Sequence, residues 1–379
     1  MKLILQKNKL TKIILIAFLV RLILLFIQYS GYDLPQAGKD TVRLERWAFE
    51  MLRGYRSTDF SDIIKDGAQL HCYIGYLIYS VVGRVPVVWS FIYLLLGLGT
   101  IYNIHKSVFL ITNSYKLANR SAWIACFFPN MAIFSVILLR EAPIHFFISL
   151  AVLYLIKYMK FKNSINIILF LIFGLLGSVF HSGVFSLFIG FFIFTILFAK
   201  KMNVFSKALL VGITLVGLYY INTTGIGLNK FGGSFEGALE GAMDGGGGMV
   251  EHGGSNYPDW LVLKGGVSDL FLIPFRIIAF LFAPLLPFLV RTGIHLIGLI
   301  DAVVYLYIIY NIFKNKNYHL NNNLVKMILV IVFSMSLAFS FGASNFGTNI
   351  RHRAKVLPIL LMLPLFSKAD HKKIKRLYK

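Results

Sequence analysis

A dense group of basic residues precedes the last apolar run of the sequence. The segment SNFGTNIRHRAKVLPIL carries Arg351, His352, Arg353 and Lys355. Arginine forks match the oxygen geometry of phosphate groups, and fixed cations beside a membrane are unfavourable unless an anion neutralises them. The segment therefore predicts a binding site for a lipid phosphate or diphosphate. Snorkelling of the cations toward lipid headgroups is the structural alternative.

Acidic residues that could act together with these cations occur in two places. Asp40 and Glu45 lie in the stretch GKDTVRLERWAFE, and Glu141 directly follows Arg140. A carboxylate can take the proton of an attacking hydroxyl group, so all three acids are candidate catalytic bases. Structural alternatives remain open: Asp40 or Thr41 caps a helix, and Arg140 and Glu141 form an interfacial ion pair.

Two further basic residues complete the candidate site. Arg43 belongs to the same stretch as Asp40, and His181 separates two apolar runs. A hydrogen-bonded interfacial histidine is the alternative for His181. The predicted ligands of the lipid phosphate are Arg43, Arg140, His181, Arg351, His352, Arg353 and Lys355.

The sequence carries no pattern of metal ligands or disulfides beside these residues. Its only cysteines, Cys72 and Cys126, form no CxxC pair, and Cys126 lies within an apolar run. Neither an HExxH nor a DxD motif is present. We therefore predict no metal and no other cofactor.

Membrane helices must position these residues. Of the 379 residues, 57% are hydrophobic and only 14% are charged, which is too apolar for a soluble domain. We predict an all-α, polytopic membrane protein in which residues 1–379 form a single transmembrane domain of about ten helices. The predicted spans are 10–28, 86–104, 121–139, 142–158, 163–180, 183–199, 204–221, 292–313, 326–342 and 352–367.

The distribution of charge predicts the orientation. One set of connecting segments holds 22 of the 38 Lys and Arg residues and a single acid, Asp370, as the positive-inside rule requires of cytoplasmic segments. Both termini are therefore expected in the cytoplasm, and the net charge of +22 does not indicate a nucleic acid partner. These basic segments are 1–12, 105–120, 157–162, 200–207, 314–326 and 368–379.

Two longer regions fall on the opposite, external side. Residues 29–85 form the first external loop, in which TVRLERWAFEMLRGY has the apolar spacing of an amphipathic surface helix. Residues 222–290 form the second region, a glycine-rich loop followed by an interfacial helix. The glycine-rich loop is interpreted as a mobile lid or as a loop that grips the acceptor, with a plain disordered connector as the alternative. The apolar stretch 70–83 is also predicted to lie at the interface.

Two charged residues interrupt predicted spans. Arg21 lies in the first span and Asp301 in the eighth. Because an unpaired charge is unfavourable in lipid, the two are expected to form a structural ion pair. The run that contains Arg21 has no small-residue cleavage site, which predicts a retained signal anchor.

The order of these segments resembles the GT-C class of membrane glycosyltransferases, which use polyprenyl-linked donors. GKDTVRLERWAFE stands where that class has its first external loop, FFPNMAIFSVILLREAP supplies a later outer turn, and NFGTNIRHRAKVLP supplies the basic terminus. The chain looks most like bacterial Wzy-type polymerases of O-antigen or capsule. It departs from them in lacking one very large external loop with paired arginine repeats.

The resemblance implies a function and a location. It implies polymerisation of undecaprenyl-diphosphate-linked repeat units at the outer face of a bacterial inner membrane, with a flippase and chain-length regulators as expected partners. One rival function is transfer of a single sugar from a polyprenyl monophosphate. Another is glycolipid transport, which predicts charges at mid-membrane and an internal repeat. A structural membrane subunit is the third, although it would not explain the outer cations.

Overall fold

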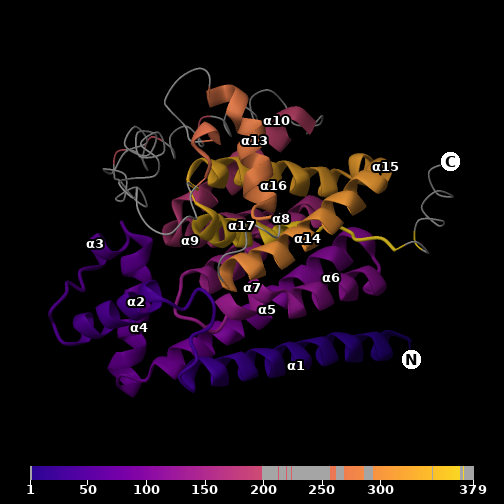
Figure 1. Ribbon diagram of the computed structural model, residues 1–379. Coiled ribbons are helices and arrows are strands. Elements are labelled where there is room, and N and C mark those ends of the chain that lie inside the picture. Colours follow the sequence, from indigo (N-terminus) through magenta and orange to yellow (C-terminus); the bar gives the residue numbers. More distant parts are fainter. Residues whose placement is uncertain are drawn as a thin grey trace.

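The chain is built from helices (Figure 1). The computed structural model describes residues 2–198, 257–261, 269–285, 293–343, 345–367 and 370, with the single positions 212, 219 and 223. Within these ranges there is no β-strand. The helices are α1 (Lys2–Tyr29), α2 (Lys39–Leu52), α3 (Phe60–Ile63), α4 (Gly67–Val82), α5 (Pro86–Thr112), α6 (Tyr115–Phe127), α7 (Pro129–Phe134), α8 (Glu141–Phe161), α9 (Ser164–Phe180), η1 (Ser182–Phe185), α10 (Ser186–Phe198), η3 (Asp259–Leu261), α13 (Asp269–Phe282), α14 (Gly293–Lys314), α15 (Lys316–Asn321), α16 (Asn323–Phe341) and α17 (Phe346–Leu360).

Five of the described helices are long and apolar enough to cross a membrane. They are the Lys9–Tyr29 part of α1 and the whole of α5, α8, α14 and α16, and each coincides with a predicted span. Two more predicted spans correspond to shorter apolar helices, Ser164–Phe180 and Ser182–Phe198. The predicted span 204–221 and the glycine-rich part of 222–267 fall outside the described residues, apart from isolated positions. These features are those of an α-helical membrane protein.

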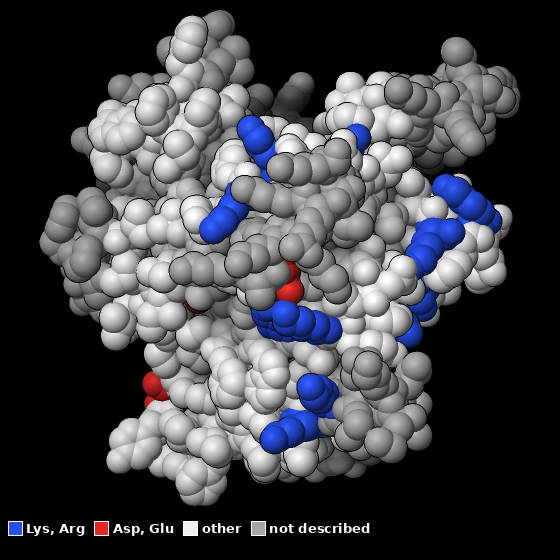
Figure 2. Space-filling view, turned by 90° about the vertical axis from the view of Figure 1, so that its right-hand side faces the viewer, with Lys and Arg blue, Asp and Glu red and all other residues white. Residues whose placement is uncertain are grey.

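The helices give the molecule two chemically different ends. Helices α2, α3 and α4 lie together at the end where α1 finishes, opposite the N-terminus (Figure 1). Because α5 and α8 run away from that end, their connections to α6 and α9 lie at the other end, which we name the basic end. Figure 2 views the side of the molecule where α1 begins in Figure 1, and Lys and Arg dominate the charges there.

An ion-pair group at the basic end involves Asp370. Its carboxylate lies 2.8 Å from Lys116 Nζ and 3.1 Å from Arg120 at the start of α6. Burial alone would raise the pKa of Asp370, but hydrogen bonds from Lys116, Ser367 and Arg120 hold it well below its usual range. The residues that follow α17 are thereby tied to the start of α6.

Two predicted spans are not continuous helices. Within 121–139, α6 ends at Phe127 and α7 ends at Phe134, after which the buried residues 136–139 are not helical. Pro129 explains the first break, because proline lacks an N–H group and disfavours helical geometry in the residue before it. Non-helical backbone of this kind is tolerated at membrane depth where protein surrounds it.

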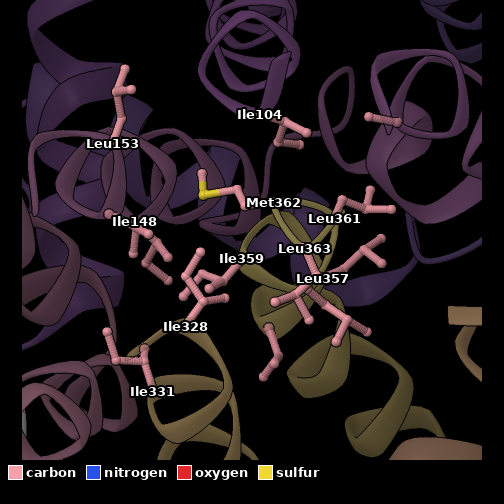
Figure 3. Close-up of a cluster of buried hydrophobic side chains, with 14 of the residues drawn as sticks. Ile104, Ile148, Leu153, Ile328, Ile331, Leu357, Ile359, Leu361, Met362 and Leu363 are labelled. Carbon is pink, nitrogen blue, oxygen red and sulfur yellow. The ribbon is translucent and has the colours of Figure 1, made fainter. Parts of the chain in front are cut away.

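The second interrupted span is 352–367. Helix α17 begins earlier, at Phe346, and ends at Leu360, four residues before Pro364. Residues 361–366 continue without helical structure but are buried. Figure 3 shows Leu361, Met362 and Leu363 of this segment among apolar side chains of the neighbouring helices, which include Ile148 and Leu153 of α8. The last apolar run therefore fills the protein core and is not a full-length helix.

Buried arginines satisfy the carbonyl groups exposed where helices end. Arg21 donates to Cys126 O at 3.2 Å and to Ala125 O at 3.4 Å, in the last turn of α6. Arg276 donates to Ser340 O at 2.7 Å at the end of α16. Cations near a helix C-terminus satisfy unpaired carbonyls and interact favourably with the helix dipole.

The predicted Arg21–Asp301 ion pair is wrong, because each residue holds a separate helix. Arg21 binds the end of α6, whereas Asp301 on α14 accepts a hydrogen bond from Asn130 in the first turn of α7. Both side chains are fully buried. They therefore fix the break between α6 and α7 from opposite directions.

Replacing Arg21 should loosen this break. Arg21→Met keeps an unbranched apolar side chain but removes all donors, so the carbonyl groups of Ala125 and Cys126 lose their partner. We expect a loss of roughly 2–4 kcal/mol in unfolding free energy, since a buried unsatisfied polar group costs about 1–3 kcal/mol. Thermal melting of the purified protein in detergent measures the loss. Arg46→Gln, at an exposed position of α2, is the control, and equal melting of both variants would contradict the capping role.

Candidate functional site

Five charged side chains from three helices form a continuous chain of ion pairs. Arg43 lies 2.7 Å from Asp40 Oδ1 on α2, and Arg351 of α17 lies 2.8 Å from Asp40 Oδ2. Arg351 Nε also lies 3.4 Å from Glu141 Oε1 of α8, and Lys355 Nζ lies 3.4 Å from the same oxygen. These ion pairs directly join residues that are up to 311 positions apart in the sequence.

Exposure falls steadily along this chain of ion pairs. The side chains of Arg43 and Asp40 are 54% and 42% exposed, Arg351 is 22% exposed, and Glu141 and Lys355 are each 2% exposed. The Glu141–Lys355 pair is therefore shielded from water, while the Asp40 carboxylate can be reached from outside. A charged ligand would meet Asp40 and Arg43 first.

Local helix geometry accounts for the positions of the two acids. Glu141 is the first residue of α8, followed by Pro143 in the first turn, and Asp40 lies in the first turn of α2. Carboxylates are stabilised there by the positive end of the helix dipole, and proline is well tolerated in a first helical turn. The predicted helix cap is wrong, because Gly38 is the N-cap residue of α2 and no side chain makes the capping hydrogen bond.

The two cations of α17 share one face of that helix. Arg351 and Lys355 are four residues apart, which brings their side chains to the same side. Asn345 begins the helix, since its side chain accepts a hydrogen bond from Thr348 N at 2.8 Å. Both cations thereby face Glu141.

Arg140 and two histidines lie beside this chain. Arg140 donates to Phe180 O at 3.2 Å at the end of α9 and is within electrostatic reach of Glu141 and Arg351. The ring centroids of His181 and His352 are 5.0 Å apart. Both rings also contact Phe339 of α16, so the predicted residues 140, 181 and 352 gather next to the ion pairs.

Helix α4 closes one side of the site through a glycine. A Cβ atom at Gly67 would clash with the Phe180 carbonyl oxygen, so only glycine permits this approach of α4 to the end of α9. The same carbonyl group accepts the hydrogen bond from Arg140. The close contact therefore sets the position of Arg140.

Two predicted site residues lie apart and have structural contacts. Glu45 pairs with Arg84 at 2.7 Å and accepts a hydrogen bond from Tyr79 Oη at 3.0 Å, which ties α2 to α4. Arg353 donates to Ala283 O at 2.6 Å and to Gly298 O, because two residues along a helix turn a side chain by about 200° from Arg351. We therefore leave Glu45 and Arg353 out of the candidate site.

Two buried histidines near Glu141 were not among the predicted site residues. His145 lies one turn after Glu141 on α8, and its Nε2 atom has no hydrogen-bond partner in the described structure. His71 of α4 is fully buried, with its Nδ1 atom 2.8 Å from Tyr93 Oη. Both are within electrostatic reach of Glu141. The i, i+4 spacing of Glu141 and His145 was the available signal; nothing in the sequence pointed to His71.

Glu141 keeps one oxygen atom available. Oε1 contacts Arg351 and Lys355, whereas Oε2 is buried and has no hydrogen-bond partner among the described residues. Buried polar atoms normally have partners, so Oε2 marks a place where a ligand could donate a hydrogen bond. The described residues contain no group of three or more His, Cys, Asp or Glu side chains that could hold a metal ion.

No family model, curated protein or solved structure matches this chain.

The buried end of the site should be sensitive to loss of one charge. Glu141→Gln leaves the Lys355 ammonium group buried without a counter-charge, and we expect a loss of about 3–5 kcal/mol in unfolding free energy. Adding Lys355→Met should restore part of it, with a coupling energy of at least about 1 kcal/mol. Thermal melting of the two single variants and the double variant gives the coupling energy.

A control for this cycle is the exposed pair Asp62–Lys65. Its atoms are 3.1 Å apart and its side chains are 64% and 42% exposed. Asp62→Asn should change stability by less than about 1 kcal/mol, because water screens the pair. Strictly additive effects at Glu141 and Lys355 would contradict their direct interaction.

Proposed function

We propose that this protein joins undecaprenyl-diphosphate-linked repeat units into a surface polysaccharide at the outer face of a bacterial inner membrane. The observation that carries the proposal is the chain of ion pairs from Arg43 to Lys355, which couples α2 to α8 and α17. Cations that are fixed at a membrane surface next to carboxylates suit a reaction whose leaving group is a phosphate.

Charge balance favours a diphosphate donor. Arg43, Arg140, Arg351 and Lys355 supply four positive charges, and Asp40 and Glu141 supply two negative charges. The excess of two matches the two negative charges of a diphosphate diester. A monophosphate diester would leave one positive charge unbalanced, so single-sugar transfer from a polyprenyl monophosphate ranks second.

The proposed reaction assigns different roles to the two ends of the site. An acceptor hydroxyl attacks the anomeric carbon of the donor, the bond from that carbon to the diphosphate breaks, and the polyprenyl diphosphate leaves with the electron pair. Arg351 and Lys355 stabilise its negative charge. Asp40 takes the hydroxyl proton, since it is the more exposed of the two carboxylates.

Binding of the donor would itself activate this base. Asp40 holds Arg43 at 2.7 Å and Arg351 at 2.8 Å, and both cations favour its ionised form and weaken it as a base. A diphosphate that draws these guanidinium groups toward its own oxygens raises the proton affinity of Asp40. The base then becomes effective when the leaving group is in place.

In this proposal the basic end faces the cytoplasm and helices α2–α4 face outward, in agreement with the positive-inside rule. A flippase that delivers the repeat units and proteins that regulate chain length are the expected partners. A transport pathway gains no support from the buried charges, since Arg21, Asp301 and Arg353 are bonded to helix ends and to Asn130.

Deleting the gene in its host tests the proposed activity. A polymerase mutant should lose the long-chain ladder of surface glycans on a gel while single capped repeat units remain. An altered or shortened repeat unit would instead establish the single-sugar transferase. Accumulation of complete lipid-linked units on the cytoplasmic side would establish the flippase.

Complementation of that deletion connects the activity to the site. Arg351→Gln should insert in the membrane but fail to restore the ladder, because the leaving diphosphate loses its main cation. Arg46→Gln, which removes an exposed arginine of α2, is the matched control and should restore it. Restoration by both variants would remove Arg351 from the mechanism.

Asp40→Asn separates proton transfer from structure. Asparagine has the same shape and keeps one oxygen, which can accept a hydrogen bond from Arg43 or Arg351, but it lacks the second acceptor oxygen and cannot take a proton at neutral pH. We expect polymer formation from lipid-linked units to slow by roughly 100-fold to 10,000-fold, the usual contribution of a general base. Normal turnover would exclude Asp40 and leave Glu141 as the candidate base.

A further inference from the structure

Lysines stacked on aromatic rings surround the basic end. Each ammonium nitrogen lies 4.1–6.0 Å from the centre of a Phe or Tyr ring. Asp370, the acid described at this end, already binds Lys116 and Arg120. The stacked pairs are Lys106–Phe109, Lys157–Tyr154, Lys160–Phe161, Lys162–Tyr158, Lys314–Tyr310 and Lys326–Phe198.

Packing of α5 against α8 brings two of these lysines together. The two helices run in the same direction, with Asn103 Nδ2 and Ser149 Oγ 3.0 Å apart and, nearer the basic end, Lys160 Nζ 2.6 Å from Leu110 O. Between these two contacts Lys106 of α5 lies within electrostatic reach of Lys157 of α8. Both lysines are half-buried, and neither forms an ion pair with a described residue.

The positive charges of Lys106 and Lys157 repel each other, and an anion that contacts both would reduce this repulsion. The packed helix backbones fix the positions of both side chains, and the Lys157 ammonium group is further fixed by the Tyr154 ring at 4.1 Å. Repulsion between the lysines is relieved when one negative group contacts both. The pair therefore has the charge of an anion site.

The depth of the pair indicates which anion. Lys106 stands six residues before the end of α5 and Lys157 four residues before the end of α8, which is about 9 Å and 6 Å along the helix axes. The polar headgroup layer of a bilayer is roughly 5–8 Å thick on each side. With the ends of α5 and α8 placed at the membrane surface, as in the proposed orientation, both lysines lie at the level of lipid phosphates. Tyr102, one turn before Lys106 on α5, is exposed.

We propose that Lys106 and Lys157 form a binding site for the phosphate group of an anionic phospholipid in the leaflet at the basic end. The lipid chains lie along α5 beside Tyr102, and the phosphate bridges the two ammonium groups. This site is at the opposite end of the molecule from the ion pairs of Asp40 and Glu141. It does not depend on the proposed transferase activity.

Lipid binding to the purified full-length protein tests the site. The protein is placed in nanodiscs of phosphatidylcholine alone or of phosphatidylcholine with phosphatidylglycerol, and retained phosphatidylglycerol is counted by native mass spectrometry. Lys106→Gln combined with Lys157→Gln should lower phosphatidylglycerol affinity by about 25-fold, since each lost contact between an ammonium group and the bound phosphate is worth about 1 kcal/mol, or about fivefold. Lys106→Arg, which keeps the charge, should retain binding and shows that the position tolerates substitution.

The control removes the same total charge elsewhere at the basic end. Lys314→Gln combined with Lys326→Gln alters two stacked lysines of α14 and α16. Phosphatidylglycerol affinity should fall clearly less than in the Lys106/Lys157 variant, because these two lysines do not contact the proposed phosphate. Equal losses in the two double variants would overturn the site in favour of diffuse surface charge. Displacement of the lipid by inorganic phosphate at equal concentration would assign the pair to a free anion and overturn the lipid assignment.

Discussion

The structure depends on how the carbonyl groups at helix ends find hydrogen-bond donors away from water. The last four carbonyls of a helix lack partners within it, and lipid offers none. Here cationic side chains of neighbouring helices supply them: Arg21 for α6, Arg140 for α9, Lys160 for α5, Arg276 for α16 and Arg353 for α13. Part of the high positive charge is therefore internal and structural. Because each such cation joins two helices, the broken helices α6, α7 and α17 hold their places in the core.

In the candidate site, cationic side chains again join neighbouring helices, but some of their partners are carboxylates and not backbone carbonyl groups. At Arg140 the guanidinium group meets both a helix end and, within electrostatic reach, the Glu141 carboxylate. Arg351 and Lys355 contact carboxylates and not backbone carbonyls, so their charges can be redirected toward a ligand without breaking a helix. Cations that terminate helices and the cations proposed to bind a phosphate thus have different partners.

Sequence patterns predicted five long apolar helices, and they also selected several charged residues that the structure brings together. Apolar runs located α1, α5, α8, α14 and α16, because hydropathy over about 20 residues is a strong signal. They missed the breaks near Pro129 and Pro364, since buried non-helical segments are as apolar as the helices around them. The local sequence also identified the Arg–Glu pair at 140–141 and the basic cluster at 351–355.

Long-range contacts explain what the sequence could not predict. Whether a cation meets a carboxylate or a carbonyl group depends on the face of the helix that carries it, and Arg351 and Arg353 differ in this respect although they are two residues apart. Glu45 is tied to Arg84, 39 positions away, which no local pattern reveals. His71 of α4 lies near Glu141 although the two residues are far apart in the sequence, so no local pattern indicated this proximity either.

Asp40 and Arg351 are 311 residues apart in the sequence, so their ion pair can form only after both residues have been synthesised. Asp40 leaves the ribosome about 300 residues before α17 does. Until α17 has inserted beside α8, the carboxylates of Asp40 and Glu141 lack the guanidinium group that joins them. A nascent chain that ends before α17 therefore carries an incomplete charge arrangement, and the ion pairs are complete only after α17 has been made and inserted.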